Sequence, residues 1–181
     1  MNRAAVVVLS AALMASLAGC TIGGPSSAPS TTPPPAPATS APAETPGPAI
    51  ADCDDLVSPS AQKRYGAAGW ALSEDFVQRM VDQQSHLVTF VDYGGALCQW
   101  GFPASDDTDV LAGSAIDAAQ QAEQRAYLEG EGFALDQHNG ADRYTVTTDT
   151  YTEIYLFAGD YWFYGSSEEA VDHIRQFADV G

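Results

Sequence analysis

The residues of this chain that could do chemistry are three histidines, its serines and many carboxylates. His86, His138 and His173 each have an aspartate or a serine nearby in the sequence. A chain with 24 acidic residues produces such neighbours by chance. The pentapeptide Gly-x-Ser-x-Gly, which carries the nucleophile of α/β-hydrolases, does not occur. We therefore expect no catalytic residue; His138 should be solvated beside a turn, and His173 should lie on the polar face of the last helix.

Two acidic clusters offer oxygen ligands that calcium could use, one at residues 52–55 and one at residues 106–109. Neither has the Asp-x-Asp-x-Asp-Gly loop with a distal glutamate that defines an EF-hand. Solvated acidic turns are the simpler interpretation, so the sequence predicts no metal and no cofactor.

The charge balance restricts the partners. Seven basic residues against 24 acidic ones give a net charge of −17. Nucleic acids and anionic lipids are bound chiefly through lysine and arginine. We therefore expect no nucleic-acid partner.

Aromatic residues are the most suggestive feature of the C-terminal part, where Tyr161-Trp162-Phe163-Tyr164 forms an unbroken run. Alternation along a strand places the second and fourth of these rings on one face. If helices cover only the other face, the exposed rings could stack on sugar or grip a peptide or lipid. The alternative is that the rings simply pack in strands. The candidate binding face comprises Tyr155, Phe157, Trp162 and Tyr164.

Cys53 and Cys98 are candidates for a disulfide, because thiols of an exported domain are usually oxidised. A redox pair would need closer spacing and a zinc site would need more ligands. Closing the long loop between them would stabilise the fold by ~4 kcal/mol in the chain-entropy estimate.

The N-terminus combines a positive start with the uncharged residues 4–19. As a helix these residues would reach about 24 Å, short of the ~30 Å hydrocarbon core, which suits a signal peptide. The segment ends in Leu17-Ala18-Gly19-Cys20, which resembles the lipobox of bacterial lipoproteins. The resemblance implies cleavage after residue 19 and a diacylated Cys20. An ordinary secretory signal or an uncleaved anchor is the alternative.

Most of the chain's 11 prolines fall within residues 20–49, among serine, threonine and alanine. Such a segment cannot bury enough apolar surface to fold, and we expect a disordered stalk. Residues 50–181 then form a single globular domain of ordinary size.

Helix and strand signals alternate along this domain. Ser58-Pro59 begins a helix that ends near Gly66, and further helices are expected from residue 73, over 117–129 and from residue 166. The expected strands cover residues 87–92, 97–102, 110–116, 133–135, 143–148, 152–158 and 161–165, with turns at 93–96, 139–140 and 159–160. The fold class is α+β, a mostly antiparallel sheet with helices on one face, two of them N-terminal and one C-terminal.

The order Cys53-x-x-Leu56-x-Ser58-Pro59, then Gly95-x-x-Cys98-x-Trp100, resembles a group of actinobacterial surface lipoproteins. Their domain has no known function, and they share the lipobox, the Pro/Ser-rich stalk and the Cys…Cys-x-Trp pattern. The resemblance implies two paired cysteines and a surface location, and it brings no catalytic residues.

We therefore expect a lipoprotein on the extracytoplasmic face of the cell membrane, anchored through Cys20. Its domain should be a non-enzymatic binding module for an envelope protein, peptide or glycan. The alternatives are an envelope hydrolase that uses acidic residues, and an accessory or structural subunit of a transporter or wall-assembly complex.

Overall fold

The computed structural model describes residues 48–102, 105 and 107–177. Its helices are α1 (Cys53–Leu56), α2 (Pro59–Ala68), α3 (Phe76–Asp82), α4 (Val88–Asp92), α5 (Ala118–Gly130) and α6 (Glu168–His173). Its strands are β1 (Ala71–Leu72), β2 (Ala96–Gly101), β3 (Thr108–Ala115), β4 (Ala134–His138), β5 (Ala141–Thr147), β6 (Thr152–Ala158) and β7 (Tyr161–Gly165).

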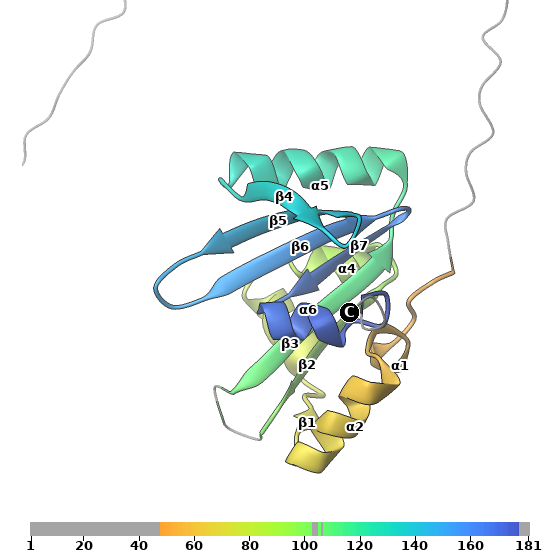
Figure 1. Cartoon of the computed structure of the whole chain (residues 1–181), viewed down its shortest axis with the longest axis vertical. Helices are drawn as coiled ribbons and strands as arrows, with labels where there is room; N and C mark the ends of the chain where they lie inside the picture. Colours follow the sequence, from red (N-terminus) through yellow and green to blue (C-terminus); the bar gives the residue numbers. More distant parts are fainter. Residues whose placement is uncertain (1–47, 103–104, 106, 178–181) are drawn as a thin grey trace, which may run out of the picture. The chain divides into compact units, whose positions relative to one another are not determined.

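All seven strands join one antiparallel sheet in the order β1-β2-β3-β7-β6-β5-β4 (Figure 1). Two tight turns form the hairpins β4–β5 and β6–β7. Asn139 and Gly140 take φ values of 49° and 82°, and Gly159 takes 59°, which glycine and asparagine adopt readily. The predicted hairpins at these turns and the α+β class with an antiparallel sheet are confirmed.

Helices cover both faces of this sheet (Figure 1). The disulfide face carries Cys98, Leu111, Ile154, Leu156 and Phe163, and it is covered by α1, α2 and α6. The pocket face carries Leu97, Ala112, Tyr144, Tyr155, Phe157, Trp162 and Tyr164, and it is covered by α3, α4 and α5. The expectation of helices on one face is therefore wrong, because apolar side chains line both sides of the central strands.

The segment expected to be a strand at residues 87–92 is the short helix α4. Leu87, Phe90 and Tyr93 are three residues apart, and all three pack into the pocket-face core. This spacing repeats on one side of a helix, not of a strand. The expected hairpin turn at 93–96 is instead the end of α4, where Gly94 takes a φ of 78°.

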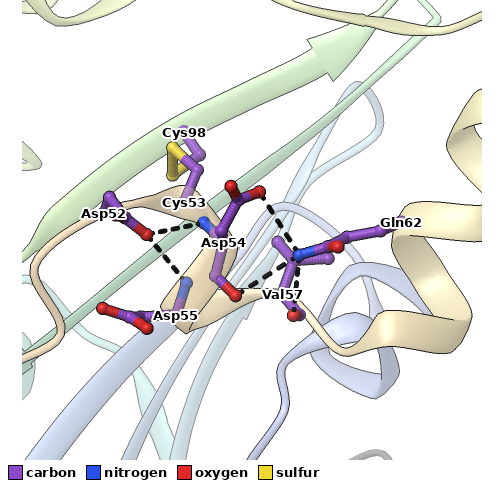
Figure 2. The surroundings of a disulfide bond; sticks show 7 residues. All are labelled: Asp52, Cys53, Asp54, Asp55, Val57, Gln62 and Cys98. Atoms are coloured by element: carbon purple, nitrogen blue, oxygen red, sulfur yellow. Dashed lines mark hydrogen bonds between the residues drawn. A yellow bond between two sulfur atoms is a disulfide. The ribbon is translucent and has the colours of Figure 1, made fainter.

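A disulfide joins α1 to β2, with 5.9 Å between the Cα atoms of Cys53 and Cys98 (Figure 2). Asp52 caps α1, since its Oδ1 accepts the backbone N–H groups of Asp54 and Asp55 at 2.9 Å. Gly113 of β3 allows α1 to pack closely on the sheet, because a Cβ atom at this position would lie only 2.8 Å from Leu56 Cδ1. The predicted disulfide is confirmed.

The remaining helix boundaries follow local signals. Ser58 caps α2 with Pro59 in its first turn, and Asp117 forms a capping box with Gln120 at the start of α5. Helix α2 continues past the expected end at Gly66 and stops at Gly69, whose φ is 77°. No helix of the described ranges is long and apolar enough to cross a bilayer.

Candidate functional site

The four rings expected to form an open binding face are buried. Tyr155, Phe157, Trp162 and Tyr164 expose 5% or less of their surface. Helix α4 lies directly on them, with Phe90 stacked on Trp162 at 3.8 Å between ring centroids. The expected ring-lined open face is therefore wrong, because it is the core beneath α3, α4 and α5.

At one end of the pocket face the helices leave a cavity of about 320 Å³, a volume that suits a small ligand. The sheet and its adjoining loops supply one wall, made of Phe133, Val146, Tyr151, Glu153 and Tyr155. The helical side supplies the other, made of Ser85, His86 and Leu87 before α4, and Tyr127 and Glu131 from the end of α5. Of the four expected binding residues, only Tyr155 lines this pocket.

The geometry of the two walls follows from the secondary structure. Glu153 and Tyr155 are two residues apart on β6, so both side chains point to the pocket face. Tyr127 and Glu131 are four residues apart at the C-terminal end of α5, so they share one side of that helix. The pocket therefore receives a carboxylate and at least one tyrosine from each wall.

Glu153 is the unusual group of this pocket. It is half-buried, and burial raises the pKa of its carboxyl. No described residue donates a hydrogen bond to this carboxylate or forms a salt bridge with it. A half-buried carboxylate without a partner is destabilising for the fold, so such a group often has a role in binding or catalysis.

Burial, and then the negative charges of these carboxylates, raise the pKa values of tyrosines in and near the pocket. Burial raises the pKa of Tyr127, and the negative charges of Glu131 and Glu153 raise it further. Burial and then the charge of Glu153 raise the pKa values of Tyr155 and Tyr164. The negative charges of Glu131 and Glu153 therefore both act on the pocket, where they meet at Tyr127.

His86 adds a ring to the pocket without a positive charge at neutral pH. Burial lowers its pKa, and the side chain of Gln124 and the charges of Glu131 and Glu123 only partly oppose this effect. The ring stacks on Tyr127 with 3.8 Å between centroids. Its Nε2 is buried and has no hydrogen-bond partner among the described residues.

A larger hollow of about 740 Å³ lies beside β1, near residues that are not described. Its cation, Arg79, is already bonded to the carboxylate of Asp75 and, at 2.5 Å, to the side-chain oxygen of Gln99. Ser73 also lies within hydrogen-bond distance of the guanidinium, at 3.4 Å. Because these groups bond to one another, this hollow is a weaker candidate site.

A second cluster of polar residues is sealed inside the disulfide face. The hydroxyl of Tyr65 donates to Asp109 Oδ2 at 2.8 Å and lies 2.7 Å from His173 Nδ1. The same His173 nitrogen lies 2.9 Å from Asp109 Oδ2. All three residues expose 8% or less of their surface. The cluster joins α2, β3 and α6, and we interpret it as structural because its members are buried and line neither the pocket beside β6 nor the hollow beside β1.

The expectation that His173 lies on a polar helix face is wrong. Helix α6 ends at this residue, and the next residue, Ile174, bridges to Val57, so the His173 side chain faces the core. His138 lies beside the Asn139 turn, where the two side chains are 3.2 Å apart.

The two acidic clusters are used locally where the structure describes them. Asp52 caps α1, and Asp109 belongs to the buried cluster with Tyr65. Asp106, of the second cluster, lies outside the described residues, as does Cys20, the expected lipidation site. Within the described ranges, no three histidine, cysteine or acidic side chains come together as metal ligands.

Comparisons of the chain with protein-family models, with curated proteins and with solved structures found no match. The candidate site therefore stands on its own geometry. Glu153 and Tyr127 are not among the residues expected from the sequence, and His86 was considered only as a catalytic group, not as part of a binding pocket. One signal was present: Glu153 and Tyr155 share a strand face, so a carboxylate interrupts a row of otherwise apolar and aromatic side chains.

Proposed function

We propose that this protein is a lipoprotein anchored to the extracytoplasmic face of the cell membrane through Cys20, and that its domain binds a small ligand without catalysis. The lipobox-like end of the leader and the Pro-rich segment support the anchor and the stalk. The Cys53–Cys98 disulfide agrees with an oxidising compartment.

The observation that carries the binding function is the pocket beside β6. It contains an unpaired, half-buried Glu153 between tyrosine rings. Pockets with a few convergent polar groups and aromatic walls are typical of small-molecule sites. The free energy that the fold loses by holding this carboxylate away from water can be recovered when a ligand binds.

Catalysis is less well supported by the same pocket. An acid-dependent hydrolase needs two carboxylates whose environments set different pKa values and whose separation fits the reaction. The pocket offers one raised carboxyl, Glu153. Ser85 is adjacent to His86, but its hydroxyl lies 3.3 Å from the backbone N–H of Leu87 and is not bonded to the imidazole. We therefore propose binding and no reaction.

The binding function is tested by recording amide NMR spectra of residues 50–181 while adding neutral, cationic and anionic small molecules at millimolar concentration. We expect shift changes to cluster at residues 85–87, 127–133 and 151–155. Shifts that cluster elsewhere, or no shifts with any of the compounds, would contradict the assignment of this pocket.

The anchor is tested separately on the full chain. Mass spectrometry of the membrane-extracted protein should find an N-terminal Cys20 that carries acyl chains, and Cys20→Ser should release the protein from membranes. An unmodified thiol or a retained leader would contradict the anchor.

A further inference from the structure

The pocket that we propose as the ligand site is negatively charged. Its two charged lining residues, Glu131 and Glu153, are both acidic. No lysine or arginine is among the described residues that line it. His86 is neutral at pH 7, since burial lowers its pKa. An anionic ligand would therefore meet repulsion without any compensating cation.

The aromatic rings of the pocket also favour a positively charged ligand. Tyr127, Phe133, Tyr151 and Tyr155 all line it. Aromatic faces carry negative electrostatic potential, and they attract alkylammonium groups in particular. Tyr127 and Tyr151 remain 40% and 53% exposed, so their rings are accessible from the solvent.

A metal cation fits these walls less well than an organic cation. Calcium takes six to eight oxygen ligands, and magnesium demands a near-octahedral set. The described part of the chain brings no three potential metal ligands together, and much of the pocket wall is aromatic or apolar. Rings and apolar side chains can contact the methyl or methylene groups of an organic cation, which they cannot do with a hydrated metal ion.

We propose that the ligand of this pocket is a small organic ammonium ion, whose charge pairs with Glu153 and whose alkyl groups contact the rings of Tyr127 and Tyr155. This inference rests on the proposed binding function and names the chemistry of its ligand. Glu131 lines the same pocket and adds a second negative charge. The volume of about 320 Å³ accommodates one small molecule of this kind.

A pair of probes of nearly equal shape isolates the role of the charge. Choline carries a trimethylammonium group, and 3,3-dimethyl-1-butanol carries a neutral tert-butyl group in its place. Titration calorimetry on residues 50–181 should show choline binding roughly tenfold more tightly than the alcohol, the range expected of desolvated cation–π and carboxylate contacts.

Two variants assign the effect to the pocket. Glu153→Gln keeps the shape of the side chain and should weaken choline binding roughly tenfold, while leaving the alcohol unchanged. Tyr127→Leu removes a ring that is 40% exposed and should weaken choline binding several-fold. The matched control is Glu169→Gln, which makes the same charge change on α6 at a side chain that is 81% exposed. It should bind choline like the parent protein.

The outcomes separate the two proposals. Equal affinities of the parent protein for choline and the alcohol would overturn the ammonium inference and leave the pocket as a site for neutral ligands. Equal loss of choline affinity in the 153 and 169 variants would overturn the role of Glu153. Failure of both probes to bind at accessible concentrations would overturn the inference together with the pocket assignment.

Discussion

The two faces of the sheet handle buried polar groups in opposite ways. On the disulfide face, Tyr65, Asp109 and His173 contact one another within 2.9 Å, beneath helices that a covalent bond helps to hold. On the pocket face, Glu153 is half-buried without a partner beside tyrosine rings. A polar group paired inside the protein stabilises the fold, whereas an unpaired one is available to a ligand. The disulfide face therefore stabilises the fold, and the pocket face is the one that we propose for binding.

The largest effect is expected from the disulfide. Replacing both Cys53 and Cys98 by serine should reduce the free energy of unfolding by about 4 kcal/mol, since the bond closes a loop with a sequence separation of 45. Denaturant unfolding monitored by tryptophan fluorescence measures this loss. Below the unfolding transition, choline binding should be unchanged. A loss of choline binding in protein that is still folded would show that the disulfide face also contributes to binding, which contradicts the separate roles of the two faces.

The next effect is expected from the buried cluster. Tyr65→Phe removes the hydroxyl that donates to Asp109, leaving a buried carboxylate with one donor fewer. The expected cost is roughly 1–3 kcal/mol in the free energy of unfolding. Tyr151→Phe is the control, because this residue is 53% exposed and surface changes stay within about 0.5 kcal/mol. Equal stabilities of the two variants would show that the cluster contributes little.

A smaller effect of opposite sign is expected at the pocket. The folded-state pKa of Glu153 lies above its ordinary value of 4.5, so the folded protein binds this proton more tightly than the unfolded chain. The free energy of unfolding therefore falls as the pH rises through the interval between these two pKa values. Glu153→Gln removes this dependence and should be more stable than the parent at pH 7.

Chemical unfolding of both proteins at a series of pH values measures this difference. The advantage of the glutamine variant should disappear well below pH 4.5, where the parent carboxyl is protonated in both states. A variant less stable than the parent at pH 7 would show that Glu153 has a stabilising partner.

Local features of the fold could be predicted because their signals lie within a few residues. Ser58-Pro59 and Asp117 begin helices, and Asn139-Gly140 turns a hairpin, through contacts that span three or four positions. The segment around Phe90 is a helix although its β-branched and aromatic composition suits a strand, because its buried side chains recur at a three-residue spacing.

The site was harder to predict because its parts are distant in the sequence. Tyr65 meets Asp109 across 44 positions and His173 across 108, and no local pattern encodes these contacts. The rings around Trp162 were identified as a group, but their burial depends on α4 and α5, which cover the sheet only after folding. At Glu153 the local signal is a charged residue on a strand face that otherwise carries aromatic side chains. This signal points to a site only when helices are known to cover that face.

The most direct measurement of the central claim is the pKa of Glu153 itself, followed through its carboxyl ¹³C resonance with and without saturating choline. A bound ammonium group beside the carboxylate favours its ionised form, so choline should lower the pKa of Glu153. An unchanged pKa of Glu153 in the choline-saturated protein would contradict the account.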